Sequence, residues 1–562
     1  MNHILLTFLI SLLTIPSLQA QIGSLWVHSY GGPMYQAAQQ VEMDMAGNIY
    51  ISGQFYGETD FDPGMGSALL TPNSTNTEYF LKLDKDGEFV WVRQFDHSIS
   101  NGQIAVQDMQ ATSNGMVILI YASDGIVDLD PDTASSFLLD ASDHRPCALV
   151  ALDSNGHFLW AQAPRSTSDL TFSSAIAVDG NDNIALVGKF QDSVYFDSVS
   201  SAVALHTTDH NPGFMAWYAP DGTALSAAQI SQGSGNLRPE GITASSDGNW
   251  FVSGTFLGEM DFDAGSGISQ DSVDDGVFTQ KIDDQGNLQW AASWKDIQWH
   301  LGHAADDNGG VYFSGGLNGI EADLNPGSAV SNWTADGFDS FILHLNENGT
   351  LLDEFVLGGS GDGFISDICK DANGSLIVSG LYTDTVQLEA QSTNPANIVS
   401  NGEQDLLLFV LHPNLELNWV ESHGGSGNDV GYTVDTHENG DFVLVGNASD
   451  TFDLFGTTFE SAGNRDAYVV HITPTQIGIE EGWQTNELQV YPNPTSGFVH
   501  LSHPEALHSI SVVDRFGRVV TQVNQPVSSL DLKHLEAGTY MIRVSTRSGE
   551  ILTKRIVLID AQ

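Results

Sequence analysis

Short apolar strands recur along the chain at a nearly constant interval, each introduced by a turn signal of glycine, asparagine or aspartate. The run Gly-Asn-Ile-Tyr at 47–50 has relatives near residues 115, 183, 249, 310, 374 and 440. Successive copies lie roughly 61 to 68 residues apart, a period typical of repeat architectures. In six of the seven copies the strand ends in a glycine, as at Gly53.

Each repeat predicts four short strands. In the first copy, one strand ends near Asp44, the second covers 49–55, and an Asp-Gly turn then joins strands at 79–84 and 88–95. Alternating apolar and polar residues on both sides of such a turn indicate a β-hairpin. Four antiparallel strands per repeat are typical of a propeller blade.

The two ends of the repeat array complement each other. The seventh copy has its third strand at 467–472 but no fourth, and residues 23–27 have the pattern of a fourth strand. The pattern therefore predicts an all-β, seven-bladed β-propeller over residues 21–474, whose last blade is completed by the N-terminal strand. An open solenoid or two smaller β domains is the alternative, but either would leave sheet edges unpaired.

The segments outside the repeats predict three further parts. An apolar run at 4–15 followed by small residues predicts a signal peptide at 1–20, and a membrane anchor is disfavoured because spanning takes about 20 residues. Residues 475–487 show neither strand nor helix periodicity and predict a linker. Alternating strands separated by Gly517, Gly538 and Gly549 predict a small β-sandwich at 488–562.

Charge and cysteine content narrow the classes of partner. The net charge is −53, and the whole excess lies before residue 486. Such a surface repels nucleic acid and favours a soluble monomer, so no nucleic-acid partner is expected. Cys147 and Cys369 fall at different phases of distant repeats, and no disulfide is expected between them.

Acidic pairs recur after the second strand of several repeats and are the candidate metal ligands. In an extended chain, residues two apart share one side, and paired carboxylates suit Ca²⁺. The alternative is that these aspartates accept hydrogen bonds within their own turns while Phe61 and its equivalents pack between blades. The candidate calcium ligands are Asp60, Asp62, Asp128, Asp130, Asp261 and Asp263.

Signatures of catalysis are missing from the sequence. No nucleophile elbow, zinc-ligand pair, cysteine cluster or phosphate loop occurs, so no catalytic or cofactor-binding residue is assigned. Histidines such as His300 and His303 show no common ligand spacing. We therefore expect a non-enzymatic propeller that binds an unknown glycan or protein. The alternative is a polysaccharide hydrolase or lyase with an acidic site on the propeller face.

Two resemblances add to this interpretation. Trp91, the Asp-Gly turn and the Gly-Asn-Ile-Tyr-Ile-Ser-Gly run at 47–53 resemble the SBBP-type β-propeller repeat over residues 22–474, although 223–225 lack the tryptophan and the second copy lacks the glycine. Residues 488–562 resemble the type A C-terminal sorting domain of the type IX secretion system. The matching segments are Tyr-Pro-Asn-Pro at 491–494, Asp514 with 517–518, Leu535 with 537–540, and Lys-Arg-Ile-Val at 554–557.

The second resemblance implies a route and a destination. It implies export through the periplasm and across the outer membrane of a Bacteroidetes-type bacterium, with residues 488–562 engaging the secretion machinery. The family also implies removal of this domain, with attachment of the protein to surface lipopolysaccharide. An ordinary carbohydrate-binding sandwich is the alternative for this domain.

Overall fold

The computed structural model describes much of the repeat array and parts of the C-terminal region. The chain divides into two compact units, Met1–Thr475 and Gln476–Gln562. The expected signal peptide and linker lie outside the described residues. Those described are 22–72, 77–95, 103–123, 125–132, 134–141, 146–166, 168, 172–197, 202–391, 395–474, 490–491, 495, 498–501, 507–514, 519–523, 529–535, 538–546 and 551–558.

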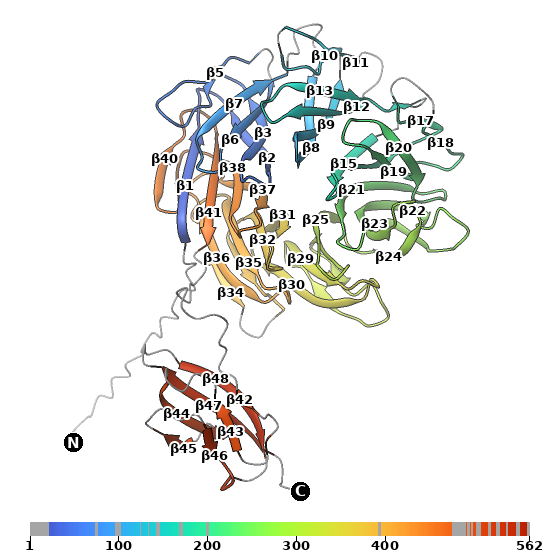
Figure 1. Cartoon of the computed structure of the whole chain (residues 1–562). Helices are drawn as coiled ribbons and strands as arrows, with labels where there is room; N and C mark the ends of the chain where they lie inside the picture. Colours follow the sequence, from blue (N-terminus) through green and yellow to red (C-terminus); the bar gives the residue numbers. More distant parts are fainter. Residues whose placement is uncertain are drawn as a thin grey trace, which may run out of the picture. The chain divides into compact units, whose positions relative to one another are not determined.

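Every element of the described residues is a β-strand, and no helix among them is long and apolar enough to cross a membrane. In the first unit, antiparallel strands form sheets that follow one another in chain order (Figure 1). The first three sheets comprise β2 (Gln36–Met43), β3 (Ile49–Phe55), β6 (Thr77–Leu83) and β7 (Phe89–Gln94); β8 (Gln103–Thr112), β9 (Gly115–Ser123), β12 (Cys147–Asp153) and β13 (Phe158–Gln162); and β15 (Phe172–Val178), β16 (Ile184–Lys189), β19 (Gly213–Tyr218) and β20 (Ala224–Gln229).

Four more sheets continue the series. The fifth is extended at its edge by β33 (Thr385–Leu388) and β34 (Ala396–Val399). These sheets comprise β21 (Asn236–Ala244), β22 (Trp250–Asp261), β23 (Gln270–Ile282) and β24 (Leu288–Trp294); β25 (Trp299–Ala305), β26 (Val311–Asn318), β29 (Phe338–Leu345) and β30 (Leu351–Gly359); β31 (Gly363–Lys370), β32 (Leu376–Tyr382), β35 (Asp405–Leu411) and β36 (Leu417–His423); and β37 (Val430–Thr436), β38 (Phe442–Ala448), β41 (Asp466–Pro474) and β1 (Ile22–Tyr30).

The sheets of the first unit follow each other around a ring. The first strand of each sheet contacts the first strand of the next, and β37 of the last sheet contacts β2 of the first (Figure 1). The strand expected at 23–27 lies in β1, which pairs antiparallel with β41 and places Trp26 opposite His471. The unit is therefore all-β and propeller-like.

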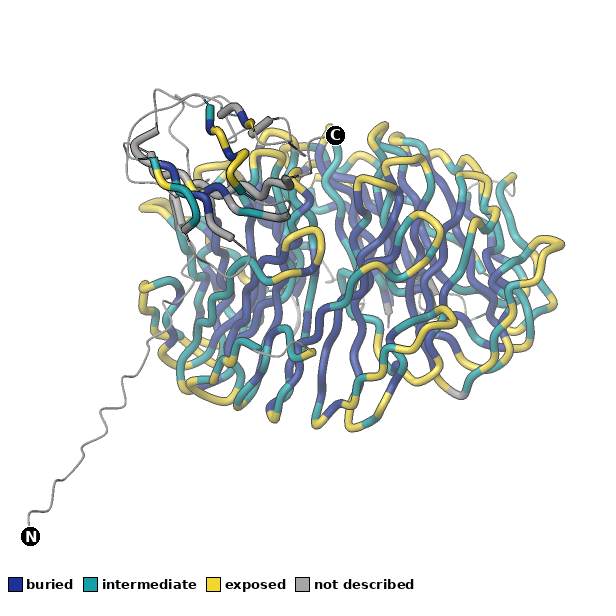
Figure 2. The backbone as a smooth tube through the Cα atoms, turned by 90° about the horizontal axis from the view of Figure 1, so that it is seen from below, coloured by how far each residue is buried: buried dark blue, intermediate teal, exposed yellow. Residues whose placement is uncertain are grey.

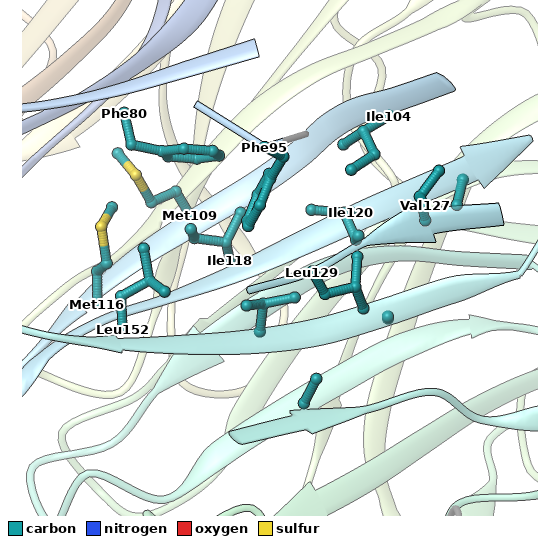
Figure 3. Close-up of a cluster of buried hydrophobic side chains, with 14 of the residues drawn as sticks. Phe80, Phe95, Ile104, Met109, Met116, Ile118, Ile120, Val127, Leu129 and Leu152 are labelled. Carbon is teal, nitrogen blue, oxygen red and sulfur yellow. The ribbon is translucent and has the colours of Figure 1, made fainter. Parts of the chain in front are cut away.

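Apolar side chains fill the space between neighbouring sheets. Figure 2 shows buried residues along the strands and exposed residues at many turns. Between the first two sheets, Phe80 and Phe95 pack against Met109, Ile118 and Ile120 (Figure 3). Burying such a side chain contributes about 1.5–3 kcal/mol, so these interfaces stabilise the ring.

A bulge in the first strand brings backbone close to the glycine that ends the second strand in most sheets, whereas in the second sheet Ile120 stands opposite the same kind of bulge. The register of β2 shifts between Ala38 and Gln40, and the backbone before the shift crosses over Gly53. A Cβ atom at Gly53 would collide with the carbonyl oxygen of Ala37. The same collision with a first-strand carbonyl would occur at Gly254, Gly380 and Gly446.

The second unit contains two sheets that share one apolar cluster. Val499 and Leu530 come from one sheet, and Ile510, Val512 and Ile542 from the other. The sheets comprise β42 (Val490–Tyr491), β43 (Phe498–Leu501) and β46 (Ser529–Asp531); and β44 (Leu507–Asp514), β45 (Val519–Val523), β47 (Gly538–Thr546) and β48 (Ile551–Leu558).

Candidate functional site in the central channel

The first strands of all seven sheets line a cavity of about 630 Å³ at the centre of the ring. Each of these strands carries a register shift, as between Val106 and Asp108 in β8 or between Ile365 and Asp367 in β31. A bulge of this kind twists the strand and re-aims the side chains around it. The repeat thus places three to six residues of every sheet on the channel wall.

Four carboxylates gather on one side of this channel. They belong to four sheets that are consecutive around the ring, the sixth, seventh, first and second. The opposite wall, from β15, β21 and β25, presents small residues at the corresponding positions, Ala175, Ala177, Gly241, Thr243, Gly302 and Ala304, together with one further carboxylate, Glu240, at the bulge of β21. The four carboxylates, which we call the channel acids, are Glu42, Asp108, Asp367 and Asp435.

Each aspartate among the channel acids joins its own sheet to the next. Asp108 Oδ2 accepts a hydrogen bond from the backbone N–H of Ile176 at 2.8 Å. Asp367 accepts one from the N–H of Val434 at 3.0 Å, and Asp435 one from the N–H of Met43 at 2.7 Å. The second oxygen of each carboxylate accepts the N–H of the following residue. These side chains therefore hold neighbouring strands together as well as facing the channel.

Burial and mutual repulsion raise the pKa values of the channel acids. Loss of hydration raises the pKa of Asp108 to about 7, and raises those of Asp367 and Asp435 to about 6. The pKa of Glu42 is raised well above its usual range by burial, and then by the negative charges of Asp435 and Asp108. Protonation of the group therefore extends toward neutral pH, where Asp108 is partly protonated, so that the group presents both hydroxyl donors and carboxylate acceptors.

Two buried histidines lie beside the opposite wall. The rings of His300 and His303 are 5.6 Å apart, and His300 also packs 5.5 Å from Phe313. Burial lowers the pKa of His303 to about 4 and that of His300 well below its usual value. Both imidazoles are therefore neutral at physiological pH, and they pack between the fourth and fifth sheets.

The predicted calcium ligands lie elsewhere, in separate sheets. Asp60 ends the short strand β4 (Thr59–Asp60), Asp128 ends β10 (Ile126–Asp128), and Asp261 ends β22. Their partners Asp62, Asp130 and Asp263 follow two residues later in each case. Each loop holds one of the three predicted pairs, and the structure does not join these pairs into one site. Among the described residues, no three His, Cys, Asp or Glu side chains form a group suited to a metal ion.

All three pairs make the same hydrogen bonds within their loops. Asp60 Oδ1 accepts the N–H groups of Asp62 and Ala68, at 3.1 and 2.7 Å, and Asp62 accepts that of Gly64 at 2.8 Å. Phe61 between them is fully buried against Tyr30 and Tyr79. The corresponding bonds recur for Asp128, Asp130, Asp261 and Asp263. These are the contacts expected of the turn interpretation, while calcium binding stays a prediction.

The sequence did not identify the channel acids. Asp108 and Asp367 occupy one phase of the repeat, next to the bulge, whereas Glu42 and Asp435 occupy a phase two residues later. No single column of the repeat is therefore acidic. The available signal was an acidic residue in the first strand, 11 to 13 positions before the strand-ending glycine or its equivalent Ile120. This spacing follows from the hairpin that joins the two strands.

Comparisons with known proteins identify the C-terminal region. Residues 489–559 match the secretion system C-terminal sorting domain. Over 195 residues the chain is 25% identical to an uncharacterized WD repeat-containing protein of Acanthamoeba polyphaga mimivirus. That alignment covers 32% of this chain and 13% of the viral protein, so the chain spans only a small part of this relative.

Several solved structures are similar at low identity. The WD40 domain of Neurospora crassa Pan2 is 9% identical, with a TM-score of 0.35, over 79% of this chain and 90% of that domain. A quinohemoprotein alcohol dehydrogenase of Pseudomonas putida is 10% identical, with a TM-score of 0.36, over 85% of this chain and 80% of the other. PorZ, a surface component of the type IX secretion system of Porphyromonas gingivalis, is 10% identical, with a TM-score of 0.15, over 94% and 100%. None of these TM-scores carries a functional implication.

The matched sorting domain determines the destination of the protein. Such a domain at residues 489–559 engages the type IX secretion machinery. The expectation of export is thereby confirmed. The chain is a propeller-like protein that the type IX secretion system exports to the cell surface or the surrounding medium.

Proposed function

We propose that the chain is a surface or secreted binding protein, built as an SBBP-type, closed seven-bladed β-propeller over residues 21–474. A signal peptide at 1–20, a linker at 475–487 and a β-sandwich at 488–562 complete the proposed organisation, with attachment to surface lipopolysaccharide after export. The pairing of β1 with β41, and the contact of β37 with β2, support the closed ring. The two sheets around one core in the second unit support the sandwich.

The asymmetric channel carries the binding proposal. One wall presents the four channel acids, and the other presents mainly small residues, which leave room for a ligand beside the single carboxylate of Glu240. Carboxyl groups that are partly protonated near neutral pH both donate and accept hydrogen bonds, which suits the hydroxyl groups of a glycan chain. Pockets of about 300–1,000 Å³ hold small ligands, so the channel is large enough for a glycan terminus.

A hydrolase or lyase is the second candidate, because carboxyl groups from several sheets meet in one channel. A general acid works best with a pKa near the operating pH, and the pKa of Asp108 is raised to about 7. However, both oxygens of Asp108 accept backbone hydrogen bonds, which hold the carboxyl group in place. Binding without turnover is therefore the function that the geometry supports best.

The test compares the mature chain with two variants on a glycan array and in a polysaccharide-turnover assay. Asp435→Asn changes one of the channel acids, and Glu438→Gln changes an exposed residue nearby. We expect glycan binding by the wild type and by Glu438→Gln, at least tenfold weaker binding by Asp435→Asn, and no released sugar. Release of sugar products by the wild type would establish the enzyme instead. Equal binding by all three proteins would exclude the channel as the site.

Calcium binding by the acidic loops is proposed separately. The second carboxylate oxygens of Asp60 and Asp62, and of the equivalent pairs, are the candidate ligands. If Ca²⁺ binds the folded state, a chelator should lower the melting temperature of the mature chain by several degrees, and added Ca²⁺ should restore it. Asp62→Asn together with Asp263→Asn should reduce the shift. A melting temperature that chelator leaves unchanged would show that these loops are turns only.

A further inference from the structure

A second cavity lies in the crevice between the last sheet and the first, on the side of the tight turns. Its volume is about 430 Å³. The turns that border it join β2 to β3, β6 to β7, and β37 to β38. We call it the closure crevice. The lining residues that matter here are Trp26, Lys85, Asp86, Asn439, Asp441 and His471.

A lysine fills the equivalent crevice at two other places in the ring. Lys82 and Lys281 occupy the strand position that His471 occupies in the last sheet, because all three stand opposite the fourth-strand tryptophan. The ammonium of Lys82 donates to the carbonyl of Ser154, at 3.0 Å, in a turn of the next sheet. Lys281 donates likewise to the carbonyl of Gly309 at 2.7 Å.

The shorter His471 side chain does not make this connection. It is 6% exposed, and its Nε2 lies 3.7 Å from the carboxylate of Asp441. Its Nδ1 is buried and has no hydrogen-bond partner within the described part of the chain. The crevice between the last sheet and the first is therefore open where a lysine would otherwise occupy it.

The fourth-strand tryptophans also differ between the closure crevice and the two crevices that a lysine fills. Trp91 Nε1 donates to the carbonyl of Ser154 at 3.0 Å, and Trp290 Nε1 to that of Glu347 at 2.8 Å. Trp26 holds the same strand position, yet its buried Nε1 has no partner among the described residues. A buried donor without a partner loses about 1–3 kcal/mol of solvation, and such groups are rare in folded proteins. Trp26 and His471 thus bring two unused polar groups to one cavity.

The chemistry of the walls indicates the class of ligand. The Trp26 ring stacks against His28 at 4.5 Å and against His471 at 5.3 Å, and the indole N–H is the polar group that this lining residue carries. Lys85 and Asp86 form an ion pair at 2.8 Å and offset each other. Donors and acceptors therefore stand side by side, with the carboxylate of Asp441 as the remaining acceptor, which matches hydroxyl groups that both donate and accept.

We infer that the closure crevice binds a neutral polyhydroxylated molecule the size of one sugar unit, at a site separate from the channel. Its volume lies within the range of small-ligand pockets. The indole N–H of Trp26 donates to one hydroxyl oxygen. The carboxylate of Asp441 and the amide of Asn439 accept from others.

The experiment titrates the mature chain with glucose, galactose, mannose and N-acetylglucosamine by isothermal titration calorimetry. His471→Lys introduces the residue found at positions 82 and 281, so we expect it to fill the crevice, to keep or raise the melting temperature, and to weaken binding at least tenfold. Lys281→His makes the reverse change in another crevice and should leave the affinity unchanged. Asn439→Ala, an exposed substitution, should weaken binding several-fold and serves if His471→Lys does not fold.

Four outcomes would overturn the inference. The first is that the wild type binds none of the four sugars. The second is that His471→Lys and Asn439→Ala both bind with the affinity of the wild type. The third is that Asp108→Asn alone loses binding, which would place the site in the channel. The fourth is that the wild type binds inorganic phosphate in preference to sugars, which would make the crevice an anion site.

Discussion

At the scale of single residues, the channel acids combine a structural role with an unusual environment. All four accept a backbone N–H from the next sheet, so they could not be replaced by apolar residues without leaving those N–H groups unpaired. Burial, and then the negative charges of neighbouring carboxylates, raise their pKa values above those of free carboxyl groups. The same side chains therefore link stability to pH.

Asp108→Asn is expected to change the pH dependence of stability. The pKa of Asp108 is raised to about 7 in the folded state, so between pH 4 and 7 the folded chain binds more protons than the unfolded chain. Its contribution to the free energy of unfolding thus falls as pH rises through this range, and asparagine removes that loss. From pH 4 to pH 8, the free energy of unfolding of the variant should rise by about 1–2 kcal/mol relative to that of the wild type. This range allows for screening by water in the channel.

Urea unfolding of both proteins at several pH values measures this difference. His300 and His303 act in the opposite direction, because neutral buried imidazoles lose stability as pH falls below about 6.5. They are common to both proteins and cancel in the comparison. If the difference in free energy of unfolding between the two proteins stays constant with pH, the pKa of Asp108 is the same in the folded and the unfolded chain.

At the scale of elements, the strands were predictable and the channel was not. Alternating apolar residues and Asp-Gly turns predicted strands at 49–55 and 79–84, and the structure has β3 and β6 there. The strand-ending glycine was visible as a repeat feature, but its cause, a carbonyl crossing from the bulged first strand, depends on a neighbouring strand. A bulge shifts which residues face inward, so periodicity alone could not bring Glu42 and Asp108 to one wall.

Gly380→Ala tests the role of this glycine. The new Cβ would collide with the carbonyl oxygen of Phe364, and backbone can yield only by disturbing the bulge. We expect the free energy of unfolding to fall by about 2–4 kcal/mol, as for other strongly disruptive core changes. Gly180→Ala is the matched control, because nothing lies within 4 Å of its Cβ. Equal stability of the two variants would show that the bulge adapts freely.

At the scale of the whole molecule, one strand joins the two ends of the repeat array. Every residue of β1 from Ser24 to Tyr30 pairs with β41, and Trp26 and Val27 pack in the cores on either side. Without β1, the edge of β41 would expose unpaired backbone groups, which promote association between chains. The closure crevice would also lose Trp26.

Removal of residues 21–30 is therefore expected to open the ring. The truncated chain should melt at least several degrees lower and form oligomers in size-exclusion chromatography. Addition of a synthetic peptide of residues 21–30 should restore part of the lost melting temperature, because the strand binds only the folded partner. A monomeric truncated chain with an unchanged melting temperature would show that β1 is not needed for closure.

The pairing of β1 with β41 also imposes an order in time. Ribosomes add about 5–20 residues per second, and Trp26 and His471 are 445 positions apart, so synthesis of the first strand precedes that of its partner by roughly 20 to 90 seconds. During that interval the N-terminal segment is available to other molecules while the intervening repeats emerge. A molecule that binds the N-terminal segment before residue 474 is synthesised therefore influences whether the finished protein closes on itself or pairs with a neighbouring chain.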